Sequence, residues 1–469
     1  MPNSAMYFPS DASYQSDLEF LDGRTGPKER PLMAIREDKP TLLVWNDWPA
    51  GQGDLVLSLA CVVEAPGPRK KKLLVFTGEA EGAPIATLDV ICSDPYQILS
   101  VRLPGTALPP DGPLSLRLQL EFGERLWLFA PDRTVSGGLK YHVPHLSLAN
   151  DTQADFLDRL CSLASLQTFS WKEGCVLDGI HAIAQKSLHP GAECSIRDHL
   201  NYFGFESGNL VYETPLSRRV ANEFTSIETT LPFAQVARID IQHPWIDMVL
   251  AFWNKLLQEN GQIREAEMIS SEGAYTVAYP MTVIARLRGE EQWIALAESL
   301  LIDTYQSLVQ PEAIYLRHYA DGRRTHGNWA RGLAWLLLGH AQTLLSQEKP
   351  SERIVEQFQN LAQFAASHQL ENGLWACFVN EPTVLPDTSG SAGIAAAFSL
   401  GAKAGLLPAE YQAKASLSKA SLLQNLTLEG FLGGCSQSNK GGEELQRSPY
   451  RVALPYAMGM LGLLIASEA

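Results

Sequence analysis

The sequence lacks the features that mark several common classes of protein. Its 7 cysteines are an odd number, and no two of them form a C-x-x-C pair, so neither a disulfide framework nor a zinc site is indicated. No apolar run reaches the roughly 18 residues that a membrane-spanning helix needs. The N-terminal residues have neither the basic segment nor the apolar segment of a secretory signal. We therefore expect a cytoplasmic protein with reduced thiols, no membrane partner and no bound metal.

Positive charge is also scarce. The chain has 37 Lys+Arg against 52 Asp+Glu, a formal net charge of -15. A surface of this sign repels polyanions, which argues against a nucleic-acid partner. A small anion can still bind such a protein where one or two arginines line a pocket. No sequence motif points to a cofactor, so none is expected. The oligomeric state stays open, with a homo-oligomer among the options.

The character of the sequence changes near residue 150. Of the 28 prolines, 16 lie in the first 150 residues. The segment "LSLRLQLEF", residues 114–122, alternates apolar and polar side chains, which is the period-2 pattern of a half-buried strand. Residues 54–64, 71–78 and 86–93 are further predicted strands, bounded by clusters rich in Gly, Pro and Asp. Residues 1–148 are therefore predicted to form an antiparallel β-sandwich domain.

From residue 149 to residue 469 the pattern is helical. Apolar residues recur with the 3.6-residue period in about twelve segments, which are joined by loops rich in Gly, Pro and Asn. Helical hairpins repeated in this way stack into a solenoid or close into a ring. Several segments, such as "SGSAGIAAAFSLGAKAG", are rich in small residues that let helices approach closely. The fold class is thus α+β and multidomain, and periodicity alone leaves the choice between ring and solenoid open.

Candidate functional side chains gather at the predicted helix starts and in the loops before them. They include two carboxylates, a histidine, an arginine and several aromatic residues: Trp171, Glu228, Glu272, His318, Arg331, Trp335 and Trp375. Aromatic faces stack on sugar rings, an arginine pairs with a carboxylate, and carboxylic acids transfer protons. The set is typical of a pocket for an acidic sugar. Asp387, followed by Thr388 and Ser389, is better explained as a helix N-cap.

Five segments, in order, resemble the unsaturated glucuronyl and unsaturated rhamnogalacturonyl hydrolases, glycoside hydrolase families 88 and 105. They are "WKEGCVLDGI", "LRHYADG", "WARGLAW", "LPDTSGSAGIAAAF" and the closing "GGCSQSNKGG" with "SPYRVALPYAMG". The resemblance covers about residues 150–469. It implies an (α/α)6 barrel, which agrees with the count of about twelve helices, and it leaves the predicted β-sandwich without a counterpart.

The resemblance also implies a reaction and a set of roles. The partner is an oligosaccharide that carries a terminal uronic acid, which is 4,5-unsaturated in the related families. A carboxylic acid protonates the double bond and water adds, with no cofactor. Glu272 matches the position of the general acid, and Glu228 matches the second acidic position. The remaining matched positions imply substrate contacts for the side chains Arg331, Trp335, His318, Trp171, Tyr275 and Trp375.

The chain departs from the family at the acids. Both matching aspartates are glutamates here, and Pro280 lies one residue later than the family pattern around Glu272 predicts. A glutamate is one methylene longer, which shifts its proton by about an ångström at a site that tolerates about 0.5 Å. Two alternatives therefore stay open. Two glutamates could hydrolyse a saturated glucuronide, as acid with nucleophile or base, or the chain could be a non-catalytic sugar-binding or assembly protein.

Overall fold

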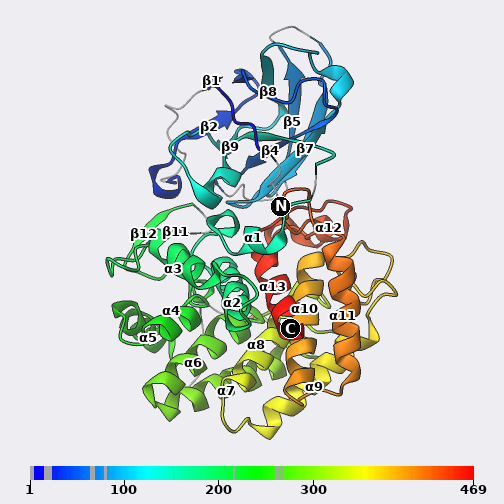
Figure 1. The fold of residues 1–469 in the computed structure, drawn as a ribbon. Helices are drawn as coiled ribbons and strands as arrows, with labels where there is room; N and C mark the ends of the chain where they lie inside the picture. Colours follow the sequence, from blue (N-terminus) through cyan, green and yellow to red (C-terminus); the bar gives the residue numbers. More distant parts are fainter. Residues whose placement is uncertain are drawn as a thin grey trace.

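A computed structural model of the chain describes residues 5–14, 24–63, 69–78, 82–151, 153–214, 217–258, 263, 265 and 268–469. The residues up to 151 form sheets, which we call the β region. The residues from 153 onward are mainly helical, and we call them the helical region. Figure 1 shows the β region seated on one end of the helical region, above α1 and α12.

The β region is built from antiparallel strands. They are β1 (Asp11–Ser13), β2 (Leu32–Ile35), β3 (Thr41–Trp45), β4 (Leu55–Ala60), β5 (Lys70–Thr77), β6 (Ala86–Ile91), β7 (Ile98–Leu103), β8 (Leu114–Phe122), β9 (Leu126–Phe129) and β10 (His145–Leu148). The sheets have the orders β1-β3-β8-β5-β6, β10-β4-β7 and β2-β9. Side chains from all three sheets share one hydrophobic core.

Strand β8 confirms the alternation that the sequence predicted. Leu114, Leu116, Leu118 and Leu120 are buried, and the residues between them are partly exposed. The pattern ends at Phe122, which is 39% exposed. A register shift between β5 and β8, between Lys72 and Leu73, turns the end of the strand out of the core.

The helical region contains α1 (Phe156–Leu160), α2 (Trp171–Gln185), α3 (Ala192–Tyr202), α4 (Phe233–Ile239), α5 (Pro244–Leu256), α6 (Tyr279–Arg288) and α7 (Glu291–Leu308). It continues with α8 (Ala330–Leu345), α9 (Glu352–Ser367), α10 (Thr388–Lys403), α11 (Glu410–Leu423), α12 (Gly442–Arg447) and α13 (Tyr456–Glu468). Short helical turns include η6 (Ile227–Thr229), η8 (Asn439–Gly441) and the π-helix η7 (Ala274–Ala278). Two small sheets complete it: β11 (Val211–Glu213) with β12 (Arg219–Ala221), and β13 (Met268–Ser270) with β14 (Arg317–Tyr319) and β15 (Arg324–Thr325).

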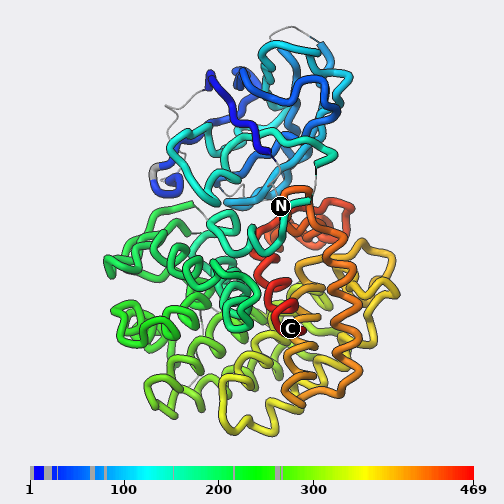
Figure 2. Tube along the Cα trace, in the orientation of Figure 1, coloured from blue at the N-terminus to red at the C-terminus, as the bar shows by residue number. Residues whose placement is uncertain are grey.

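Helices α2, α4, α6, α8, α10 and α13 pack one against the next, and α13 returns to α2. Figure 2 shows the C-terminal helix, in red, beside segments from both ends of the helical region. Small residues permit these contacts. A Cβ added at Gly459 of α13 would lie 1.9 Å from the carbonyl oxygen of Cys175 in α2, and one at Gly390 of α10 would lie 2.8 Å from Ala330 in α8. The small residues noted in the sequence therefore allow these helices to pack closely.

Candidate functional site

The starts of the packed helices bring the candidate residues toward one end of the helical region. Trp171 is the first residue of α2, and Arg331 and Trp335 lie in the first turns of α8. Glu228 lies in η6 just before α4, and Glu272 precedes η7 and α6. These helices start near the loop of residues 433–443, which we call the glycine-rich loop. Lys440 of this loop acts electrostatically on Glu228, and Ser436 binds Arg331.

Glu228 and Glu272 are held together by an arginine. The Nη2 atom of Arg317 lies 3.1 Å from Oε2 of Glu272 and 3.9 Å from Oε1 of Glu228. The Glu272 side chain is 9% exposed, and those of Arg317 and Glu228 are 20% and 27% exposed. Ser270 donates a hydrogen bond of 2.7 Å to Oε2 of Glu272. Two carboxylates and one cation therefore form a cluster that solvent still reaches.

The two acids of this cluster differ in their electrostatic surroundings. Burial and the neighbouring charge of Glu272 raise the pKa of Glu228 to about 7, while Arg317 and Lys440 act in the opposite direction. Glu272, in contrast, forms the shorter contact with Arg317. A carboxyl group with a pKa near neutrality is suited to proton transfer at physiological pH.

A small sheet determines which side chain faces the glutamates. Strand β14 pairs with β13 so that Arg317 lies opposite Ser270, next to Glu272. Successive side chains of a strand point to opposite faces, and His318 accordingly meets Ser307 of α7, with 2.7 Å between its Nδ1 atom and the hydroxyl. The segment "LRHYADG" thus brings its arginine, rather than the predicted histidine, to the two acids.

A π-helix, η7, lies between Glu272 and Pro280. It begins two residues after Glu272 and ends at Ala278, and α6 follows with Pro280 as its second residue. A π-helix has i→i+5 hydrogen bonds and often occurs at functional sites. The candidate acid is therefore followed by backbone that differs from a regular α-helix.

Aromatic rings from α2, η7 and α8 pack against one another, Trp171 on Trp335 edge to face and Tyr275 on Trp335 face to face. The rings of Trp171 and Trp335 lie 4.9 Å apart, and those of Trp335 and Tyr275 lie 6.0 Å apart. The hydroxyl of Tyr275 donates to Asp178 of α2 at 2.5 Å, which fixes the ring in place. Trp171 is partly exposed, while Trp335 and Tyr275 are buried. The structure thus brings three of the predicted aromatic residues together, with Trp171 the most accessible of them.

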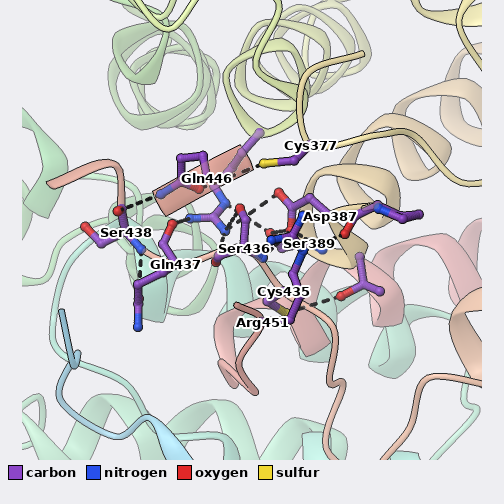
Figure 3. Close-up of polar contacts among 12 residues, drawn as sticks. Cys377, Asp387, Ser389, Cys435, Ser436, Gln437, Ser438, Gln446 and Arg451 are labelled. Atoms are coloured by element: carbon purple, nitrogen blue, oxygen red, sulfur yellow. Dashed lines mark hydrogen bonds and ion pairs between the residues drawn. The ribbon is translucent and has the colours of Figure 1, made fainter. Parts of the chain in front are cut away.

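Arg331 lies in a second, buried cluster. Its Nη2 atom donates to the carbonyl oxygen and the hydroxyl of Ser436, at 2.5 and 2.8 Å, and its Nε atom donates to Ser389 at 3.0 Å. Nη2 also lies 3.7 Å from Asp387, and the Arg331 side chain is 3% exposed. Figure 3 shows Asp387 beside Ser436 at one end of this stretch of the loop and Gln446 beside Ser438 at the other. These contacts hold the glycine-rich loop against the starts of α8 and α10.

The predicted role of Trp375 does not agree with its position. Its side chain is fully buried, its indole N–H donates to the carbonyl oxygen of Ala365 in α9 at 2.7 Å, and its ring packs on Phe398. A ring enclosed in this way cannot stack on a sugar without unfolding its surroundings. We therefore leave Trp375 out of the proposed site and correct its role to core packing.

The sequence patterns missed two residues of this region. One is Arg317, whose only signal was its place beside the predicted His318. The other is His326, which has a φ of 52° and whose N–H donates to Glu443 at 2.9 Å. Within the described chain, both its ring nitrogens are buried without a hydrogen-bond partner. Burial, with Arg317 and Arg447, lowers the pKa of His326.

A cavity of about 140 Å³ adjoins the acids. Its lining includes both glutamates, Glu265 and Ser270. Glu265 accepts hydrogen bonds from Ser226 and from the N–H of Ile227, at 3.0 and 2.8 Å, and so holds the segment that carries Glu228. Among the residues that the structure describes, no group of three His, Cys, Asp or Glu side chains is arranged to hold a metal, and no helix is long and apolar enough to cross a membrane.

Comparisons with known proteins show which sequences and folds the chain resembles. Residues 253–469 match the sequence model of glycosyl hydrolase family 88. No curated protein matches the chain in sequence. A solved structure of a possible member of family 105 from Salmonella enterica is 17% identical, covering 68% of this chain and 84% of its own, with a TM-score of 0.56.

Two further solved structures are similar. A family 105 glycoside hydrolase of C. acetobutylicum is 16% identical over 65% of this chain and 94% of its own, with a TM-score of 0.56. An unsaturated glucuronyl hydrolase specific for heparin is 14% identical over 66% of this chain and 94% of its own, with a TM-score of 0.52. At this identity the likenesses show a shared fold. They leave about a third of this chain uncovered.

Proposed function

We propose that this chain, whose residues 253–469 match the model of glycosyl hydrolase family 88, is an exo-acting hydrolase that removes a terminal 4,5-unsaturated uronic acid from an oligosaccharide. The observation that supports the proposal most is the cluster in which Glu228 and Glu272 lie within 4 Å of one nitrogen of Arg317. We further propose that α2, α4, α6, α8, α10 and α13 are the inner ring of an (α/α)6 barrel, residues 149–469, preceded by a β-sandwich domain, residues 1–148.

The chemistry needs one proton and one water. The C4=C5 bond of the unsaturated sugar is a vinyl ether, so protonation at C4 gives a cation at C5 that the ring oxygen stabilises. Water adds at C5 and returns its proton to the carboxylate pair. The C5 hemiketal opens to a ketone, and the hemiacetal left at C1 releases the aglycone as an alcohol. The carboxylate pair thus ends in the protonation state in which it began.

The pair carries this proton as a unit. In the free protein Glu228 holds a proton near neutral pH, because burial and Glu272 raise its pKa to about 7, and Glu272 is engaged by Arg317. A substrate carboxylate that binds Arg317 competes with Glu272 for the guanidinium. Glu272 then loses its cation partner and receives the proton, which it delivers to C4. Glu272 therefore keeps the donor role that the family match implies, and Glu228 stores the proton.

The other side chains orient the sugar. Trp171, the most accessible of the three packed rings, offers a face for the sugar, and Trp335 and Tyr275 hold it in place. Arg317 replaces Arg331 as the proposed receptor for the uronate, because the Arg331 guanidinium is already bound by Ser389, Ser436 and Asp387. Arg331 instead holds the glycine-rich loop at the site.

A saturated glucuronide is the second candidate substrate, supported by the replacement of both family aspartates with glutamates. The two reactions can be separated with a 4,5-unsaturated uronyl disaccharide and its saturated counterpart. We expect the absorbance of the C4=C5 bond to disappear with the first and no sugar to be released from the second. Turnover of the saturated sugar alone would replace the hydration mechanism by ordinary glycoside hydrolysis, and binding of both without turnover would favour a sugar-binding protein.

A further inference from the structure

One segment of the β region reaches into the end of the helical region where the site lies. Residues 91–98 connect β6 to β7 and contain two non-glycine residues with positive φ, Cys92 at 54° and Tyr96 at 63°. Such conformations are costly and persist only where the surroundings impose them. Both regions provide these surroundings: the N–H of Tyr96 donates to the carbonyl oxygen of Cys61 in the β region, and the Tyr96 hydroxyl lies 3.3 Å from that of Tyr202 in α3.

The segment is bound to the glycine-rich loop and to the chain that follows it. The Nε2 atom of Gln437 donates to Oε1 of Gln97 at 3.0 Å and to the carbonyl oxygen of Ile91 at 3.2 Å. Gln97 and Gln437 are both buried. The hydroxyl of Tyr450 accepts from the N–H of Ile91, and the N–H of Ile98 donates to the carbonyl oxygen of Ala453, just before α13.

The same segment also holds the start of α2. Oδ1 of Asp94 lies 2.8 Å from Nζ of Lys172, and both side chains are only 6% exposed. Lys172 follows Trp171, the most accessible ring of the proposed sugar platform. Gln97 connects the two attachments, because its Oε1 atom also accepts the N–H of Asp94 at 3.1 Å.

The glycine-rich loop, which this segment binds, is in turn linked to the two glutamates. The backbone of Ser436 and Gln437 accepts the hydrogen bonds of Arg331. Farther along the loop, Lys440 is one of the charges that act on Glu228, together with Glu272, Arg317 and Glu265. Glu443 accepts the N–H of His326 at 2.9 Å. A shift of the loop would therefore change the charges around the glutamates.

We propose that the β region is a fixed part of the active site, in which Gln97 and Asp94 are positioning residues that hold the glycine-rich loop and the start of α2. The inference rests on the proposed function for the location of the active site. It gives the β region a role that the matched sugar hydrolase sequence, residues 253–469, does not contain.

Gln97→Ala tests the proposal against a matched control. Ser58→Ala removes a different buried hydrogen bond between the two regions, the 2.5 Å bond from Ser58 to Glu429, and does not touch the segment. Hydrogen–deuterium exchange of residues 433–443 should become about 2- to 10-fold faster in Gln97→Ala, the effect of losing one hydrogen bond, and stay unchanged in Ser58→Ala. This readout needs no substrate, so it decides the positioning role even if the proposed reaction is wrong.

The link to the site is tested by kcat/KM on the unsaturated disaccharide. In Gln97→Ala we expect a loss of about 10-fold and an upward shift of the basic limb of its pH profile, because a displaced Lys440 no longer lowers the pKa of Glu228. Ser58→Ala should keep both values. Unchanged exchange of the loop in Gln97→Ala would overturn the positioning role. Faster exchange with an unmoved pH limb and wild-type kcat/KM would overturn the connection to the active site.

Discussion

The Arg331 cluster and the Arg317 cluster both place an arginine against acidic side chains near helix starts. They differ in their exposure to solvent and in the number of acids that contact the arginine. In one, Arg331 and Asp387 are enclosed, and Arg331 and the hydrogen bonds of Ser436 and Ser389 lower the pKa of Asp387. In the other, Arg317 meets two acids, one of which has its pKa raised to about 7. The cluster with one arginine and one acid stabilises a loop. The cluster with one arginine and two acids keeps a proton on one of the acids, and that proton can be transferred.

The largest expected effect concerns the enclosed cluster. Arg331→Met leaves Asp387 buried without its cation, and breaking a buried ion pair costs about 3–5 kcal/mol of unfolding free energy. Chemical denaturation monitored by circular dichroism measures this loss. Glu272→Gln, measured in the same way, should lose far less. Equal stability of the wild type and Arg331→Met would contradict the stabilising role of the Arg331 cluster.

Arg317→Met should act on binding. It removes the proposed receptor for the uronate, and charge-assisted hydrogen bonds are worth about 1.5–3 kcal/mol, which corresponds to a rise in KM of about 10- to 100-fold. The basic limb of kcat/KM should also move to higher pH, because Arg317 lowers the pKa of Glu228. Arg317→Lys, which keeps the charge, is the matched control and should recover part of both effects. An unchanged KM would return the receptor role to another residue.

The pH profile tests the proton store. The folded-state pKa of Glu228 is raised from its usual 4.5 to about 7, so activity that needs the proton should fall as the pH rises through about 7. By the same linkage, the group favours the folded protein below about pH 4.5, and this contribution is lost between about pH 4.5 and 7. Glu228→Gln should reduce the pH dependence of stability in this window and leave a reduced rate. A rate as low as that of Glu272→Gln would indicate that Glu228 is a nucleophile.

The smallest effect is expected at His318. Its ring is bonded to Ser307 on the face of β14 opposite Arg317, so His318→Ala should change kcat/KM by no more than about 2-fold, the range of substitutions away from key contacts. Steady-state kinetics on the unsaturated disaccharide measures it. A loss of 100-fold would restore the predicted role of His318 in substrate binding.

Much of the fold was visible in the sequence. Period-2 alternation predicted β8, and 3.6-residue periodicity predicted most of the long helices, because burial of one face imposes these periods. The roles of arginines could not be read in this way. Arg317 and His318 are adjacent in sequence, and only the pairing of β14 with β13 decides which of them meets Glu272. Likewise, "WARGLAW" does not show that Ser436, more than a hundred residues later, occupies the guanidinium of Arg331.

The glycine-rich loop gives a second example of this limit. The sequence marked this loop only by its resemblance to the family's closing segment, but the contacts of Gln437 with Gln97 join it to a different region of the chain. Neither residue has a distinctive neighbourhood in the sequence. The π-helix η7 just before Pro280 had no signal of its own in the sequence either, and only the structure identifies it.

The most direct test of the account is to measure turnover and binding of an unsaturated uronyl disaccharide by Glu272→Gln. The amide keeps the size of the side chain but cannot donate a proton to carbon, and general acid catalysis is worth about 10²- to 10⁴-fold. We predict a loss of kcat in this range, measured by the absorbance of the double bond, with the dissociation constant from calorimetry changed only slightly. A Glu272→Gln protein with near-wild-type kcat would contradict the account, because the proton would then come from a group outside the glutamate cluster.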